Sequence, residues 1–300
     1  MADIAHSHHS LALPDGRSLG YARYGDPTGT PILYFHGGIS SRLDIKFASE
    51  RCLERKIQLI APDRPGTGLS CRKPRRSLLD FADDVEFLLK SLEIEQCRLL
   101  SWSLAGPYAF ACAYKTPHRF LRVATVGSAV PPECPESVSG LGMLIDRMLL
   151  TCPPGLLWIL AYLLQIASKL PTEYIKRQMI FDIGAKEDRA IIEALSTREA
   201  TEFVLESVRQ NGFGVVDDYL AVSSAWGFSL GDIGLPIELF HGERDQVASP
   251  SSSHYLAKHL PLGNLRMIED AGHFLLRTNL DRVLDILLDD EDSSSKTQAA

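Results

Sequence analysis

The sequence predicts an α/β fold in which a mostly parallel sheet, flanked by helices, is interrupted by a helical insertion. Short apolar runs alternate with segments of helical periodicity over residues 31–127, and this alternation resumes at residue 236. Uninterrupted apolar runs are typical of strands that are buried on both faces of a parallel sheet. From residue 131 to about residue 226 the pattern is predominantly helical instead, which indicates an insertion.

A β-hairpin is expected to open the fold. Asp15-Gly16 separates the alternating segments LALP and SLGYARYG, and Asp-Gly is a typical centre of a tight hairpin turn. His6, His8 and His9 precede it, on what we expect to be a flexible, unstructured start. We therefore assign these histidines no metal-binding role.

Further strands are expected at apolar runs, with helices between them. The strand segments are PILYF (31–35), IQLIA (57–61), CRLLSW (97–102), RVATVG (122–127), PIELFHG (236–242) and NLRMIED (264–270). Apolar residues recur at 78, 81, 82, 85, 88, 89 and 92, a spacing that fills one face of a helix. Other helices are expected at about 42–55, after Ser103, at 250–260 and at LDRVLDILL (280–288).

These patterns divide the chain into three parts. We expect a core of residues 1–130 and 227–290, a helical cap or lid at 131–226, and a disordered tail at 291–300. Within the cap, the apolar stretch GLLWILAYLLQIA (155–167) is shorter than the roughly 20 residues that cross a bilayer. We expect a buried lid helix or an apolar wall of the substrate pocket there, with contact to a membrane surface as the less favoured alternative.

The amino-acid composition limits what this protein is expected to bind and where it is expected to reside. Acidic residues outnumber basic ones by 38 to 31, the formal net charge is -7, and no run rich in lysine and arginine is interleaved with aromatic residues, so we expect no nucleic-acid partner. The six cysteines are scattered, without a C-x-x-C pair or histidines at zinc-ligand spacing. Together with a start that lacks a secretory pattern, they predict reduced thiols in a cytoplasmic protein without a metal. The oligomeric state is left open, a dimer included.

Ser103 has the surroundings of a catalytic nucleophile. It stands between an apolar strand and a small-residue helix, which is the strand-turn-helix setting of a nucleophile elbow. Ser101 and Ala105 replace the two glycines of the usual G-x-S-x-G pattern, and both are small enough for a strand and a helix to approach closely. The alternative is that Ser103 only caps the helix.

A serine hydroxyl needs a base that removes its proton and an acid that orients the base. His273 follows the last expected strand and Asp245 follows the strand before it, so the three residues come in the order serine, aspartate, histidine. Glu243 is the alternative acid, but the strand-end position favours Asp245. The remaining histidines have no matching order of acid and nucleophile along the chain and are interpreted as structural or surface residues: His118, His241, His254 and His259.

Two backbone N–H groups are expected to stabilise the oxyanion that forms when a serine attacks a carbonyl. One belongs to Leu104, directly after the nucleophile, and the other to Gly38, which follows the strand that ends at His36-Gly37. Gly38 lets a substrate approach without a side chain in the way. A plain turn is the alternative interpretation of this segment.

Five segments, in this order, resemble the α/β-hydrolase superfamily: LPDGRSLGYARYGDPTGTPILYFHGG, APDRPGTGLS, SWSLAGPYAFACAYKTPHR, FHGERDQV and EDAGHFLL. The resemblance covers nearly the whole chain and implies an α/β-hydrolase fold with an eight-stranded sheet and a helical cap. It also implies catalysis by Ser103, Asp245 and His273 without a cofactor. A serine at the elbow disfavours epoxide hydrolase and haloalkane dehalogenase chemistry, which uses a carboxylate nucleophile in this family.

The predicted function is hydrolysis of a carboxylic ester, lactone or thioester of a hydrophobic small molecule through an acyl-Ser103 intermediate. The same three residues could serve C–C bond hydrolysis, acyl transfer, or a non-hydrolytic cyclisation or lyase step in small-molecule metabolism. A ligand receptor that has kept the fold is the alternative from another class, although no member of the triad is missing.

Overall fold

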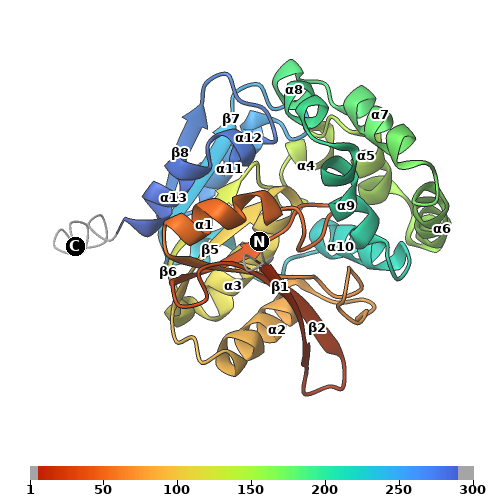
Figure 1. Ribbon diagram of the computed structural model, residues 1–300. Helices are drawn as coiled ribbons and strands as arrows, with labels where there is room; N and C mark the ends of the chain where they lie inside the picture. Colours follow the sequence, from red (N-terminus) through yellow and green to blue (C-terminus); the bar gives the residue numbers. More distant parts are fainter. Residues whose placement is uncertain (1–5, 290–300) are drawn as a thin grey trace.

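The computed structural model describes residues 6–289, and they form an eight-stranded sheet with helices on both faces (Figure 1). The strand order is β1-β2-β4-β3-β5-β6-β7-β8. The strands are β1 (His6–Ala12), β2 (Ser18–Gly25), β3 (Thr30–Phe35), β4 (Ile57–Pro62), β5 (Cys97–Trp102), β6 (Phe120–Val126), β7 (Ile237–Gly242) and β8 (Gly263–Ile268). From β4 to β8 along this order every neighbouring pair is parallel, which confirms the mostly parallel α/β sheet.

Helices follow most of the strands, and a group of them stands between β6 and β7. Those outside this group are α1 (Ser49–Glu54), α2 (Leu78–Ser91), α3 (Gly106–Lys115), α11 (Pro250–His259), α12 (Leu275–Thr278) and α13 (Leu280–Leu288). Those between β6 and β7 are α4 (Glu136–Ser139), α5 (Leu144–Thr151), α6 (Leu157–Ala167), α7 (Thr172–Asp182), α8 (Lys186–Ala194), α9 (Thr197–Ser207) and α10 (Phe213–Ser223).

Both faces of the sheet are buried, which explains the uninterrupted apolar runs. Leu33 and Phe35 of β3 belong to a core formed with α2, α3 and α11. The intervening Ile32 and Tyr34 belong to a second core formed with α1, α12 and α13. Because successive side chains of a strand point to opposite faces, each central strand contributes to both cores.

The opening hairpin is confirmed, but the expectation of an unstructured start is wrong. β1 begins at His6 and pairs antiparallel with β2 over its whole length. His8 Nδ1 accepts a hydrogen bond of 3.3 Å from Arg42 Nε, and the His9 ring stacks on Tyr21 at 4.9 Å between centroids. The histidines are therefore part of the outer strand of an edge hairpin, in which the His8 and His9 rings contact Arg42 and Tyr21.

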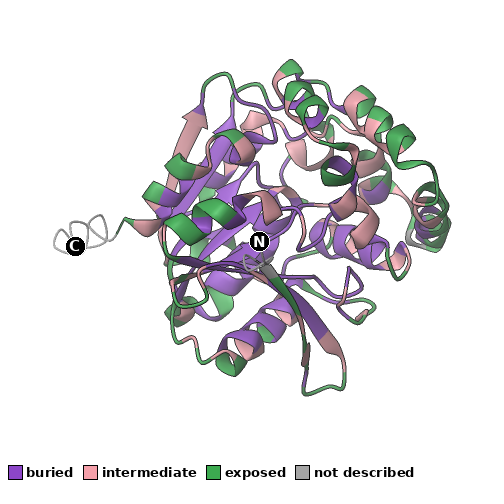
Figure 2. Cartoon of the chain, viewed as in Figure 1, coloured by how far each residue is buried: buried purple, intermediate pink, exposed green. Residues whose placement is uncertain are grey.

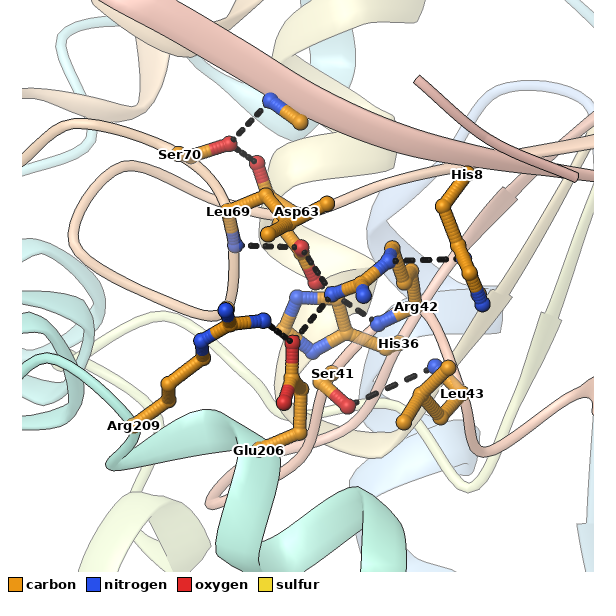
Figure 3. Close-up of polar contacts among 12 residues, drawn as sticks. His8, His36, Ser41, Arg42, Leu43, Asp63, Leu69, Ser70, Glu206 and Arg209 are labelled. Carbon is orange, nitrogen blue, oxygen red and sulfur yellow. Dashed lines mark hydrogen bonds and ion pairs between the residues drawn. The ribbon is translucent and has the colours of Figure 1, made fainter. Parts of the chain in front are cut away.

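The helix expected at 42–55 is also wrong in its first half. The segment before Lys46 is a turn, and α1 covers only Ser49–Glu54. The reason is that Arg42 is buried and engaged: its backbone N and its guanidinium donate to Asp63 at 2.8 and 2.7 Å, and the same guanidinium contacts Glu206 of α9 at 2.7 Å (Figure 3). These contacts fix the turn against the loop after β4.

The segment expected as a helical cap contains helices α4 to α10, gathered on one side of the molecule (Figure 1). We call it the helical insertion, residues 131–226. Among its described residues the one β-type contact is an isolated bridge between Leu141 and Ala248. The tail expected at 291–300 lies outside the described residues.

Helix α6 is not the buried lid helix that its composition predicts. Leu157, Leu160 and Ala161 are buried, whereas Tyr162 and Ile166 are 56% and 63% exposed, and α6 to α8 carry much exposed surface (Figure 2). The idea of contact with a membrane surface stays a hypothesis. Over residues 6–289 the structure has no helix whose length and apolar character would allow it to cross a bilayer.

Candidate active site

Three residues from different strand ends meet at one edge of the sheet. Ser103 follows β5, Asp245 follows β7 and His273 follows β8. Ser103 Oγ lies 2.8 Å from His273 Nε2, and His273 Nδ1 donates to Asp245 Oδ2 at 2.7 Å. The structure thus brings together the three residues expected from the sequence order, while the alternative acid Glu243 is exposed.

Ser103 lies in a sharp turn between β5 and α3. Its φ of 57° falls in the left-handed region, which non-glycine residues adopt only when the surroundings impose it. Gly106 explains part of the tight geometry, because a Cβ placed there would lie 1.7 Å from Ser128 Oγ. Ser101 and Ala105 fit within this elbow and are completely buried.

The carboxylate of Asp245 is held by four hydrogen-bond donors. Its Oδ1 accepts from the backbone N–H groups of Val247 and Ala248 at 2.8 and 2.9 Å, and its Oδ2 accepts from His273. His241 Nε2 lies 3.2 Å from the same Oδ2. Burial opposes ionisation, but the facing His273 and the hydrogen bonds hold the pKa of Asp245 well below its ordinary value.

His241 is a buried, structural histidine, as the sequence predicts, and it contacts Asp245 itself. Its Nδ1 lies 2.6 Å from Ser253 Oγ and its Nε2 lies 3.0 Å from the Ala248 carbonyl. A proton on Nε2 satisfies both that carbonyl and Asp245, so this ring supports the acid rather than the nucleophile.

His273 is fixed through its backbone as well as its ring. Its N–H donates to Asp188 Oδ2 and that of Phe274 donates to Asp188 Oδ1, each at 2.8 Å, and Asp188 comes from α8 of the helical insertion. Trp102 Nε1 donates to the His273 carbonyl at 3.1 Å. Burial favours the neutral ring, but the charge of Asp245, supported by Asp188, raises the pKa of His273 above its ordinary value.

The two expected oxyanion donors belong to adjacent residues in space. A Cβ built on Gly38 would lie 3.3 Å from Leu104 Cβ, so the loop after β3 contacts the turn after β5. Arg64 holds this loop from behind: its guanidinium donates to the carbonyls of His36 and, at 2.7 Å, Gly37. Arg64 thus fixes the two carbonyls that directly precede Gly38 in this loop.

Arg64 depends in turn on helix α10. It is 1% exposed and forms an ion pair of 2.9 Å with Asp218, which also accepts hydrogen bonds from Tyr108 and Arg76. Burial opposes ionisation of Asp218, but the two arginines lower the pKa of its carboxyl. A buried arginine without such an acid would be strongly unfavourable. The position of the loop after β3 therefore depends on α10.

The sequence reasoning did not find these supporting residues. Asp188, Asp218 and Tyr219 come from the helical insertion, and Arg64 comes from the loop after β4. One signal was present: Asp217-Asp218-Tyr219 interrupts the otherwise apolar segment FGVVDDYLAV of α10. Two adjacent acids in a buried helix require cationic partners, and such a pattern indicates contacts with another part of the chain.

A cavity of about 160 Å³ opens beside Ser103. Apolar side chains form much of its wall, among them Leu104, Val130, Leu150, Val222 and Val247. Helices α5 and α10 contribute to this wall, whereas α6 supplies none of the described residues that line it, so the expectation of α6 as a pocket wall is wrong. The arrangement can activate Ser103 next to an apolar binding space.

The chain was compared with known proteins. A family model described as the alpha/beta hydrolase fold matches residues 30–151. An uncharacterised hydrolase of Bacillus subtilis (strain 168), YcgS, is 25% identical over 265 residues, which are 87% of this chain and 90% of that protein. A pimeloyl-[acyl-carrier protein] methyl ester esterase of Aromatoleum aromaticum (strain DSM 19018 / LMG 30748 / EbN1) is 26% identical over 177 residues, 57% of this chain and 64% of that protein.

Solved structures share the fold over nearly the whole chain. A thermophilic esterase from Thermogutta terrifontis is 20% identical with a TM-score of 0.68, covering 94% of this chain and 97% of that one. The epoxide hydrolase VrEH1 from Vigna radiata is 15% identical with a TM-score of 0.70, covering 96% and 98%. Taken with the strand order and the match of the family model to residues 30–151, these similarities show that the chain has the α/β-hydrolase fold.

Proposed function

We propose that this protein is a serine hydrolase that cleaves a carboxylic ester, lactone or thioester of a hydrophobic small molecule. The α/β-hydrolase fold and the hydrolase relatives support hydrolase-type activity. The observation that carries the proposed serine mechanism is the chain of hydrogen bonds from Ser103 through His273 to Asp245. Ser103 itself lines a largely apolar cavity. Serine at the elbow, instead of a carboxylate, favours acyl chemistry over epoxide opening.

Each residue has a defined role in the proposed reaction. Ser103 Oγ attacks the carbonyl carbon while His273 Nε2 takes its proton, and the N–H groups of Gly38 and Leu104 stabilise the oxyanion. His273 then gives the proton to the leaving oxygen or sulfur, which leaves an acyl group on Ser103. Water attacks this ester with His273 again as base, and the carboxylic acid departs as Ser103 regains its proton.

We also propose that the helical insertion acts as a cap. Its helices α5 and α10 line the cavity next to Ser103, which supports a role of residues 131–226 in substrate selection. All six cysteines are free thiols, which supports the proposed cytoplasmic location.

A fluorophosphonate probe tests the mechanism directly. The intact protein should gain one probe adduct, located on Ser103 by peptide mass spectrometry, and S103A should gain none. S223A is the matched control, because Ser223 also lines the cavity but donates to the Leu220 carbonyl instead of contacting His273. S103A should also lose on the order of a millionfold in ester turnover. An unlabelled wild-type protein, or an adduct that persists in S103A, would refute the proposal.

Labelled water then separates hydrolysis from acyl transfer and cyclisation. Hydrolysis places one solvent oxygen in the carboxylic acid product, whereas acyl transfer to an alcohol and cyclisation place none. A product without the label, formed by a chain whose Ser103 reacts with the probe, would replace hydrolysis by acyl transfer or cyclisation.

A further inference from the structure

An acidic side chain lies within the apolar cavity beside Ser103. Asp146, from α5, lines this cavity together with Tyr219 of α10. Glu136 is the other acid at the wall, and among the described lining residues none is lysine, arginine or histidine. The cavity that would receive the substrate therefore carries negative charge without a cation of its own.

Tyr219 connects this acid to the oxyanion loop. Its hydroxyl donates to Asp146 Oδ1, and a Cβ built on Gly38 would lie 2.6 Å from the same hydroxyl oxygen. The pair thus stands directly over the loop that carries one of the expected oxyanion donors. A substrate whose carbonyl is placed at Ser103 must pass or contact this pair.

The Tyr219 bond engages only one carboxylate oxygen. Oδ2 of Asp146 can still accept a hydrogen bond, and Tyr219 is the hydrogen-bond partner of this acid among the described residues. Burial raises the pKa of the Asp146 carboxyl, while the Tyr219 hydroxyl opposes that shift. A carboxylate in such surroundings gains most from a ligand that supplies a donor or a positive charge.

We propose that Asp146 and Tyr219 form a specificity subsite that selects substrates bearing a hydrogen-bond donor, as a hydroxyl or an ammonium group, and that rejects anionic ones. This inference rests on the proposed hydrolase function and names the substrate class for the same cavity. Tyr219 holds the carboxylate in place, and Asp146 Oδ2 accepts from the substrate. Like charge at Asp146 and Glu136 disfavours a substrate carboxylate.

Four matched esters test the subsite. Each series uses p-nitrophenyl esters of one acyl-chain length that end in a methyl, hydroxyl, ammonium or carboxylate group, and three lengths cover the depth of the cavity. At one length or more, wild-type kcat/KM should be roughly ten- to a hundredfold higher for the hydroxyl and ammonium esters than for the methyl ester. It should be lowest for the carboxylate ester.

Variants assign the preference to its residue. D146N should remove the preference for ammonium and relieve the rejection of the carboxylate, and Y219F should weaken both effects. E136Q is the matched control, because it removes the other acid of the same cavity and should keep the order of the four esters. Circular dichroism and the rate of Ser103 labelling report whether D146N is folded.

The outcomes distinguish this inference from the proposed function. Turnover without a donor preference at any length, or an unchanged order in D146N, overturns the subsite and leaves the hydrolase proposal intact. If no ester is turned over, binding of the matched N-methylamides to S103A, measured by calorimetry, still tests the subsite. Equal affinity for all four termini would then overturn it.

Discussion

At the scale of single residues, the elbow combines strain with a buried hydroxyl. Ser103 adopts a left-handed φ, and two residues earlier the Ser101 hydroxyl is completely buried without a hydrogen-bond partner among the described residues. An unpaired buried hydroxyl destabilises the folded state. The usual glycine at this position would avoid that cost but would leave the unfolded chain more flexible.

Replacing Ser101 by alanine should therefore stabilise the protein. S101A keeps the Cβ, removes the unpaired hydroxyl, and should raise the free energy of unfolding by about 1 kcal/mol, as measured by urea denaturation. S128A is the comparison, because the Ser128 hydroxyl donates to the Ala129 carbonyl at 2.9 Å and its loss should destabilise. A clear destabilisation by S101A would show that the hydroxyl contributes to packing or hydrogen bonding after all.

At the scale of elements, helix α8 bears on the chemistry through one side chain. Asp188 binds two successive backbone N–H groups of the His273 loop, and a Cβ on Gly272 would lie 2.2 Å from Asp188 Oδ2. The close approach requires glycine at position 272. The loop that presents the base is thus shaped by a helix about 85 residues earlier in the chain.

The variant D188N should shift the pH dependence of the reaction. Only neutral His273 can accept a proton from Ser103, so kcat/KM should rise with pH through the pKa of His273, which the charge of Asp245 raises above its ordinary value. Removing the negative charge of Asp188 weakens the stabilisation of the protonated ring, and the midpoint should move to lower pH.

The matched control for D188N is E187Q. Glu187 is the neighbouring acid on α8 and pairs with Arg244 at the surface, away from the His273 ring. Its loss should leave the midpoint where it is. Equal midpoints in D188N and the wild type would show that Asp188 has no electrostatic influence on His273.

The helices and strands also show which parts of the structure could be predicted from the sequence. Apolar runs located the strands, since burial on both faces of a sheet leaves a local pattern, and chain order located Ser103, Asp245 and His273. The turn at Arg42 was missed because its partners are distant in sequence, and the hairpin was expected without the part of β1 that begins at His6. Asp188 was missed because the backbone N–H groups that it binds, those of His273 and Phe274, are also distant in sequence.

At the scale of the whole molecule, the helical insertion and the sheet-bearing part are joined by oppositely charged groups. The insertion supplies acids and the rest supplies arginines: Arg42 pairs with Glu206 at 2.7 Å, Arg64 with Asp218 at 2.9 Å, and Arg72 with Asp217 at 2.6 Å. Removing one partner of a buried pair costs about 3–5 kcal/mol, so separating the two parts would strongly destabilise the folded protein.

The two parts should consequently unfold together. Trp158 lies on α6 of the insertion and Trp102 lies beside His273, so variants that keep only Trp158 or only Trp102 of the three tryptophans report on each part separately. Their thermal transitions, followed by fluorescence, should coincide with each other and with the loss of helix followed by circular dichroism. A lower midpoint for the Trp158 signal would mean that the insertion melts first.

The contribution of α10 limits how this enzyme can be redesigned. Asp217 pairs with Arg72, and Asp218 pairs with Arg64, which binds the loop after β3. The Tyr219 hydroxyl lies against Gly38 of that loop. Replacing the helical insertion by that of another protein would discard these groups together with the residues of α5 and α10 that line the cavity. A successful chimera would have to retain the Asp-Asp-Tyr turn of α10 and confine its exchanges to α4 through α7.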